Sequence, residues 1–330
     1  MSTVLVTGAS GYIAKHIVRE LVEQGHAVRA STRSEKRRAE IGALFPDAEI
    51  DYVSLDLTSD EGWTEARDGV DVLMHTASPL PSDQPKDPQE LIRPAVDGTK
   101  RALRAAHGAG VHRVILTSSV AAVFKGANLT NGTTLNESDW TDPNSPRATA
   151  YDKSKTLAER AAWEFVAEHR EMKLTTINPG GVFGPAMDMN YGALLGYVER
   201  FLSGGVPMVA NLTFSIVDVR DVARMHVAAM DQPESSGERF IASAGDVSMV
   251  DLARLLAEAY PDRRISTRKA PDFLIRSIAT FVPMLRAVVQ NLGMHNPIDG
   301  TKASTTFGFT YITPQEAVLE SARYLVTNGK

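Results

Sequence analysis

Two residues, Tyr151 and Lys155, have the types and the spacing needed to move a proton. They open a segment with helical periodicity, where a four-residue separation places them on one face, one turn apart. A phenol titrates near about 10 in water, but a neighbouring ammonium stabilises the phenolate and lowers its pKa. The pair is therefore a candidate acid/base centre. Taken alone, Tyr-x-x-x-Lys also occurs by chance as a surface couple.

Two adjacent serines supply a second candidate group. Ser118 and Ser119 directly follow Val114–Thr117, an apolar run typical of a buried strand. Ligands of parallel α/β sheets bind at the carboxyl ends of the strands. A hydroxyl there can donate to a substrate carbonyl and stabilise charge on its oxygen. Capping of the strand end is the alternative role for both serines.

A glycine-rich turn joins the first apolar run to the first helical segment. Gly8 permits a tight turn, Gly11 lets backbone amides approach a pyrophosphate, and the small Ala14 allows the helix to pack closely on the strand. The helix N-terminus adds partial positive charge toward the phosphates. A Ser-Tyr-Lys set behind such a loop is a much stronger indication than any one part. The other expected contributors to this cradle are Ser10, Tyr12 and Ile13.

The second strand ends in a basic run rather than in an acid. An NAD enzyme usually places an acidic residue there for the ribose 2′-hydroxyl, whereas Arg33 is followed by Lys36, Arg37 and Arg38. Guanidinium and ammonium groups suit a 2′-phosphate, so the run favours NADP(H) over NAD(H). A solvated first helical turn is the alternative. Asp56 and Leu57, after the third strand, are candidates to hold the adenine, although an Asp in that position is ordinarily a helix cap.

Short apolar runs alternate with segments of 3.6-residue periodicity through the first two-thirds of the chain. This alternation predicts an α/β fold of the Rossmann type, a doubly wound parallel sheet with helices on both faces. The predicted strands are Val4–Val6, Ala27–Ala30, Ile50–Leu55, Val70–His75, Val114–Thr117 and Leu174–Ile177, and the clearest helices are Ile13–Val22, Pro88–Ala109 and Tyr151–His169.

The pattern changes after Pro179, where glycines and prolines become frequent. We expect residues 1–178, with a return through 213–242, to form the NADP-binding domain. Residues 179–212 and 243–330 should form a smaller C-terminal substrate-binding lobe. The loop from Lys125 to Ala150 is long for a compact domain, and such loops are more often functional than idle.

Composition excludes several classes of function. The chain has 330 residues, 43% of them hydrophobic, and 35 basic against 40 acidic residues, so no basic excess is present to bind nucleic acid or an anionic membrane. It has no cysteine, and its eight histidines show no metal-binding spacing, so we expect no metal. The apolar stretch 273–292 is interrupted by Arg276, Pro283 and Arg286. We therefore expect a cytoplasmic protein that acts on a small molecule, as a monomer or a homodimer.

In these motifs the chain resembles the extended short-chain dehydrogenases/reductases, in particular the dihydroflavonol reductase-like branch that includes NADPH-dependent carbonyl and methylglyoxal reductases. The resemblance runs in order over about the first two-thirds of the chain, and the last part matches only loosely. The matching segments are 7–14, Asp56-Leu57, 75–79, 94–99, Thr117-Ser118-Ser119, 151–155 with Ala158-Glu159, 178–185 and 217–223.

The resemblance implies a role for each matching residue. Ser119, rather than Ser118, is expected to be catalytic, with Tyr151 as proton donor and Lys155 as its partner and as a ligand of the nicotinamide ribose. Arg33 matches the position of the phosphate-binding arginine in NADP-using relatives. Further cofactor contacts are expected from Thr76, Ala77, Ser78, Thr117, Pro179, Gly180 and Val182.

Departures from the family pattern restrict the classes of substrate that we expect. Phe124 replaces the asparagine with which plant flavonoid reductases contact their substrate, and Val120 to Ala122 lack the Asp-Glu pair of nucleotide-sugar dehydratases. Phe124 and Tyr191, with Met187 and Met189, would suit a small or aromatic carbonyl. We therefore expect NADPH-dependent reduction of an aldehyde or ketone. The alternatives are a nucleotide-sugar epimerase with retained NAD and a non-catalytic NADP(H)-binding regulator, although such regulators commonly lose the tyrosine or the lysine.

Overall fold

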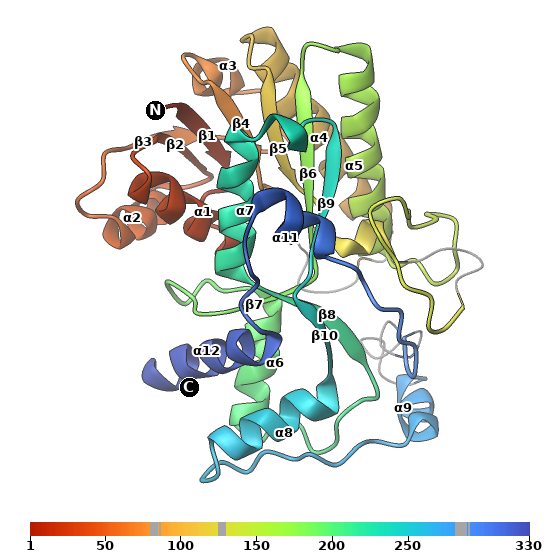
Figure 1. Ribbon diagram of the computed structural model, residues 1–330. Coiled ribbons are helices and arrows are strands. Elements are labelled where there is room, and N and C mark those ends of the chain that lie inside the picture. Colours follow the sequence, from red (N-terminus) through yellow and green to blue (C-terminus); the bar gives the residue numbers. More distant parts are fainter. Residues whose placement is uncertain (80–84, 86, 125–129, 281–288, 290) are drawn as a thin grey trace.

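Figure 1 shows the computed structural model of the chain, which describes residues 1–79, 85, 87–124, 130–280, 289 and 291–330. Lys125, Pro283 and Arg286, named above, lie outside the described residues.

Seven parallel strands form one sheet in the order β3-β2-β1-β4-β5-β6-β9. The six predicted strands correspond to β1 to β6 within two residues at each end, because strands buried on both faces are continuous apolar runs that the sequence displays directly. The predicted Rossmann-type α/β fold is confirmed. The strands are β1 Thr3–Thr7, β2 Ala27–Thr32, β3 Ile50–Ser54, β4 Val72–His75, β5 Arg113–Thr117, β6 Lys173–Pro179 and β9 Glu238–Ala242.

Helices cover both faces of this sheet (Figure 1). On one face α1 (Tyr12–Glu23) packs against α7 (Val219–Asp231), and on the other α4 (Gln89–Gly108) packs against α5 (Ala150–Glu168). Each face has its own buried core of aliphatic side chains. The shorter helices of this part are α2 Glu35–Leu44, α3 Trp63–Arg67, η1 Val120–Ala122 and η2 Pro233–Ser235.

A second, three-stranded sheet in the order β10-β8-β7 forms the base of the smaller lobe in the lower half of Figure 1. Helices α6, α8 and α12 pack together there around a third core. Besides α7, η2 and β9, the described elements after β6 are β7 Gly181–Phe183, α6 Ala193–Leu202, β8 Thr213–Asp218, β10 Gly245–Ser248, α8 Met249–Ala259, α9 Asp272–Ala279, α11 Thr301–Phe307 and α12 Pro314–Thr327.

Two elements do not follow the expected division of the chain. Strand β8 lies inside the expected return segment 213–242, but it pairs with β7 and β10 of the small sheet. Helix α11 lies inside the expected lobe, but it packs against β9 and α7 of the large sheet. Both placements depend on long-range pairing, which the local apolar pattern does not encode.

Candidate active site

The turn between β1 and α1 is a cradle for an anionic group. Gly8 has a φ of 64°, and a Cβ there would lie 2.9 Å from the Cα of Ala77, so the turn packs directly on the segment after β4. The Gly8 amide donates to the Ser31 hydroxyl at 3.0 Å. Helix α1 begins at Tyr12, and Gly11, the N-cap residue before it, provides no side-chain cap. Its first amides are therefore available to phosphate oxygens, which fits a dinucleotide pyrophosphate.

The side chains around this cradle contact the smaller lobe. The Tyr12 hydroxyl donates to the Gly184 carbonyl at 2.8 Å, and the Ser10 carbonyl accepts from the Asn190 amide at 2.7 Å. Burial raises the pKa of Tyr12 well above its ordinary value. Ile13 is half-buried and packs against two cores. Tyr12 therefore joins the two lobes through its side chain, and only its backbone faces the expected cofactor.

The basic residues after β2 lie on the surface near the end of β3. Arg33 and Lys36 are exposed. The Asp56 carboxylate accepts from the backbone amide of Thr58 at 2.7 Å and from its hydroxyl. These two hydrogen bonds lower the pKa of Asp56, and the charge of Arg33 lowers it further. Arg33 and Asp56 therefore lie in one region of the surface, as an adenosine-phosphate site formed by both residues requires. Leu57, by contrast, packs into the core beside α4.

A threonine–histidine pair holds the backbone after β4. The Thr7 hydroxyl oxygen accepts from the amides of Thr76, at 3.1 Å, and Ala77, at 3.2 Å. Its own hydrogen is then directed to Nδ1 of His75 at 2.8 Å. Burial lowers the pKa of His75 to about 3, so the imidazole is neutral. The pair fixes the start of the segment 76–78, and Ser78 at its end is half-buried.

The three hydroxyls at the end of β5 have three different partners. The Thr117 hydroxyl bonds Nε2 of His226 at 2.7 Å, and the Ser118 hydroxyl donates to the carboxylate of Glu159. The Ser119 hydroxyl accepts from the Ala121 amide at 3.1 Å, which caps η1, and it also interacts with the Tyr151 side chain, whose pKa it lowers. The structure therefore brings together Ser119 and Tyr151, as the resemblance implies, and turns Ser118 away.

Burial dominates the electrostatics of the tyrosine and the lysine. It raises the pKa of Tyr151, which the Ser119 hydrogen bond opposes, and it lowers the pKa of Lys155 to about 8, which the charge of Glu159 opposes. The Lys155 ammonium lies 6.0 Å from the centre of the Tyr151 ring. The expectation that Lys155 lowers the pKa of Tyr151 is therefore not met in this structure, because desolvation of the phenol outweighs any effect of the ammonium.

A cavity of about 150 Å³ begins one residue after Ser119, although Ser119, Tyr151 and Lys155 are not among the described residues that line it. Phe124 lines it, together with Val120, which follows Ser119 directly. At its boundary the two sheets approach closely, since a Cβ on Gly180 would lie 2.7 Å from the Ser215 carbonyl oxygen. The remaining lining residues are Arg147, Gly181, Leu212, Thr213, Phe214, Ser215, Asp246, Asn291, Met294, His295, Asn296 and Ile298.

Tyr191 is not among the described residues that line the cavity. Its hydroxyl donates to Glu199 at 2.7 Å, and its ring packs beside the Tyr12 core. The neighbouring residues Asp188 and Asn190 bond Lys15 and the Ser10 carbonyl, so this segment lies against the start of α1. Met189 is 51% exposed. The segment expected to face Phe124 therefore covers the phosphate cradle instead.

The last expected cofactor residues lie where β6 continues into β7. Pro179 ends β6 and pairs with Ala242 of β9, while the Gly180 amide donates to the Ala242 carbonyl at 3.0 Å. Val182 in β7 packs between the cores of the two lobes. The expected cofactor residues thus lie at or after the carboxyl ends of β1 to β6, apart from Tyr151 and Lys155 in α5 and Val182 in β7.

The sequence assigned no role to the polar residues behind the site, although three of them lie in segments that carry the family resemblance. The main ones are His75, Asn178, Glu159 and Arg239, all of them buried. Glu159, four residues after Lys155 in a helix face rich in alanine, was the one local sign of such a group. Among the described residues no cluster of three or more His, Cys, Asp or Glu could hold a metal ion, and no helix there is long and apolar enough to cross a membrane.

The fold and the cradle define a Rossmann-type α/β protein with a dinucleotide-type phosphate site. The model of the NAD dependent epimerase/dehydratase family matches residues 4–243, and the chain belongs to this family. The resemblance inferred from the motifs is thereby confirmed.

The relatives are reductases. Cinnamoyl-CoA reductase 1 from Arabidopsis thaliana is 35% identical over 271 residues, 81% of this chain and 77% of the relative. The NADPH-dependent methylglyoxal reductase GRE2 of Saccharomyces cerevisiae is 30% identical and covers 98% of both chains. A crystal structure of yeast methylglyoxal/isovaleraldehyde reductase Gre2 complexed with NADPH covers 99% of each chain, with a TM-score of 0.83 and 28% identity.

Proposed function

We propose that the protein reduces an aldehyde or ketone to the alcohol with NADPH. The observation that supports this proposal is the interaction of Ser119 with Tyr151 at the carboxyl end of β5, next to Val120 in the wall of a small cavity. The similarity to methylglyoxal and cinnamoyl-CoA reductases supports it.

Three side chains have separate roles in the proposed reaction. Tyr151 donates a proton from its hydroxyl to the substrate oxygen, and Ser119 donates a hydrogen bond that stabilises charge on that oxygen. Lys155, whose pKa is lowered to about 8 by burial, is charged at neutral pH and stabilises the phenolate that remains. A bound nicotinamide would supply the hydride to the carbonyl carbon.

The residues present fit an NADPH molecule. The uncapped start of α1 would hold the pyrophosphate, and the exposed Arg33 and Lys36 would hold the 2′-phosphate. Thr76 to Ser78 and Pro179 to Val182 would border the nicotinamide half.

The cavity favours a small substrate. A volume of about 150 Å³ suits a short-chain or single-ring carbonyl compound, and an apolar cavity of that size is known to hold benzene. Phe124, Phe214 and Ile298 give it apolar walls.

The test is a spectrophotometric assay of nicotinamide oxidation. Wild type and Tyr151→Phe are compared with NADPH and with NADH across a panel of short-chain and aryl aldehydes and ketones. We expect turnover with NADPH for wild type and a loss of at least a hundredfold in Tyr151→Phe, because the variant keeps the ring but has no proton to donate.

Other outcomes would contradict the proposal. Equal turnover by Tyr151→Phe would remove the tyrosine from the mechanism. Tightly retained NAD in the purified protein, without net reduction, would favour the epimerase. Reversible NADPH binding without turnover of any compound in the panel would favour the cofactor-binding regulator.

A further inference from the structure

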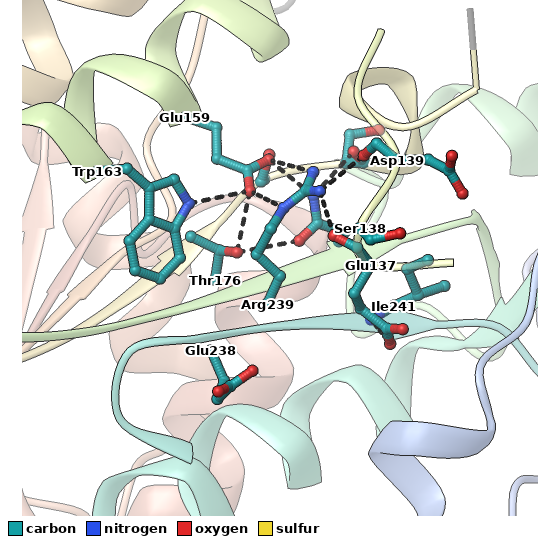
Figure 2. Close-up of polar contacts among 12 residues, drawn as sticks. Glu137, Ser138, Asp139, Glu159, Trp163, Thr176, Glu238, Arg239 and Ile241 are labelled. Atoms are coloured by element: carbon teal, nitrogen blue, oxygen red, sulfur yellow. Dashed lines mark hydrogen bonds and ion pairs between the residues drawn. The ribbon is translucent and has the colours of Figure 1, made fainter. Parts of the chain in front are cut away.

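We propose that the buried Glu159–Arg239 pair is a positioning element of this site, which fixes the backbone of Ser119 and holds a negative charge close to Lys155. The inference rests on the proposed function, since it assigns the pair a part in the reaction of Ser119, Tyr151 and Lys155. Figure 2 shows the pair, with the guanidinium of Arg239 facing the carboxylate of Glu159.

The Glu159 carboxylate is fully enclosed and receives donors from its own helix α5, from β6, from β9 and from the segment after β5. Its side chain is 0% exposed, and Nε of Arg239 lies 2.7 Å from Oε1. Trp163 Nε1 donates to the same oxygen at 3.3 Å and the Thr176 hydroxyl donates at 3.1 Å (Figure 2). A buried carboxylate is tolerated only when its lone pairs are occupied in this way. The geometry therefore fixes Glu159 rigidly.

The second oxygen of Glu159 contacts Ser118 directly and reaches Ser119 through Asn178. It accepts from the Ser118 hydroxyl and from the Asn178 amide at 2.8 Å. The same Asn178 nitrogen donates to the Ser119 carbonyl at 3.2 Å. Ser119 is thus held through its neighbour and its own carbonyl, while its hydroxyl accepts from the Ala121 amide at 3.1 Å and interacts with Tyr151. A displacement of about 1 Å at a reacting group can lower a rate about a hundredfold.

Glu159 also lies one helical turn after Lys155 on α5. Its charge raises the pKa of Lys155 against the lowering effect of burial. Within the described part of the chain, the other titratable groups that face Lys155 are Tyr151 on α5 and His75 on β4. His75 is neutral, because burial lowers its pKa to about 3. Glu159 is therefore the negative charge that favours the ammonium form of Lys155.

Arg239 extends the clamp to the wall of the cavity. Its Nη1 donates to the carbonyls of Glu137, at 2.6 Å, and Asp139, at 2.7 Å, and its guanidinium lies 3.7 Å from the centre of the Trp140 ring. Glu137 and Asp139 lie in the loop before α5. Leu135 of that loop packs in a small core with Val123 and Ile241, against Phe124 and Ile298. One buried charge pair thereby connects the reacting hydroxyl with the surface that would receive the substrate.

The principal test is the double variant Glu159→Gln/Arg239→Met, which removes both charges and leaves no unpaired buried ion. We expect a folded protein with a lower melting temperature, because the carbonyls of Glu137 and Asp139 lose their donor. The KM for the carbonyl substrate should be unchanged, and kcat should be lowered about ten- to a hundredfold. We also expect the alkaline limb of the kcat–pH profile to move to lower pH. The reason is that loss of the Glu159 charge lets burial lower the pKa of Lys155 further.

Ser118→Ala separates the two parts of the proposal and is available if the double variant fails to fold. It removes one hydrogen bond to Glu159 but leaves both charges in place. We expect kcat to fall severalfold, with the alkaline limb unmoved. The matched control is Glu238→Gln, which removes an equal charge from the neighbouring residue, where Glu238 pairs with Lys302 at the surface. It should leave both kcat and the pH profile unchanged.

The outcomes are distinct. If wild type shows Tyr151-dependent turnover and the folded double variant matches it in kcat and pH profile, the pair is structural only and the inference is overturned. An unchanged kcat in Ser118→Ala would overturn the clamp on Ser119. If wild type itself shows no Tyr151-dependent turnover with NADPH, the proposed function fails first and the inference falls with it.

Discussion

Acid should destabilise the protein through His226, a histidine that the fold keeps neutral. Its side chain is fully buried in α7, and burial lowers its pKa to about 4. The Val222 carbonyl can only accept, so Nδ1 donates to it at 2.7 Å and Nε2 must accept from the Thr117 hydroxyl. Protonation of Nε2 would place a positive charge and a hydrogen against the Thr117 hydroxyl. Among the described residues, no acidic side chain forms an ion pair with His226 that would stabilise this charge.

The magnitude follows from the pKa difference. In the unfolded chain the imidazole titrates near about 6.5, and each pH unit below that value costs about 1.4 kcal/mol until the folded group also protonates near about 4. The sign is fixed because the folded pKa is the lower one, so stability is complete above about pH 6.5 and is lost as the pH falls. The expected loss from His226 is about 2 kcal/mol at about pH 5 and about 3 kcal/mol at about pH 4.

The assay is urea unfolding of wild type and His226→Gln between about pH 7.5 and 4.5. Glutamine offers a donor and an acceptor but does not titrate. The free energy of unfolding of the variant should therefore fall less steeply with decreasing pH. Below about pH 6 the difference between the two slopes should correspond to about one bound proton. The buried His16 and His75 are common to both proteins and cancel in the difference. The exposed His112→Gln should match wild type in slope. Parallel curves for wild type and His226→Gln would refute the reasoning.

Three further predictions concern the proposed cofactor and substrate sites. Gly8→Ala should weaken NADPH binding at least tenfold in a fluorescence titration, because its Cβ meets backbone at 2.9 Å. Gly25→Ala, with a similar positive φ of 77° but nothing within 4 Å, should leave the affinity unchanged. Arg33→Ala should raise the KM for NADPH about tenfold or more and leave that for NADH unchanged, whereas the exposed Arg254→Ala should change neither; equal effects on both cofactors would remove Arg33 from the phosphate site. Phe124→Ala should shift kcat/KM about tenfold in favour of aryl ketones over short aldehydes, and an unchanged ratio would remove Phe124 from the substrate cavity.

The sequence by itself determined six of the seven strands of the large sheet, three of the helices on its faces (α1, α4 and α5) and the cradle. Fully buried parallel strands are apolar runs, and an amphipathic helix repeats every 3.6 residues, so both can be recognised within a few neighbouring residues. The glycine turn at Gly8 and the four-residue spacing of Tyr151 and Lys155 are local for the same reason. These features predicted the fold class and the position of the candidate site.

Only the tertiary structure decided what surrounds that site. Glu159 and Arg239 are 80 residues apart, and a buried pair of this kind leaves no periodicity that could connect them. Residues 291–298, which complete the cavity, come from the loosely patterned end of the chain. Tyr191 has the chemistry of a pocket residue, but the packing of its segment on α1 turns it toward Glu199. Contacts between distant segments depend on how whole elements dock, and their physical origin is long-range packing rather than local sequence.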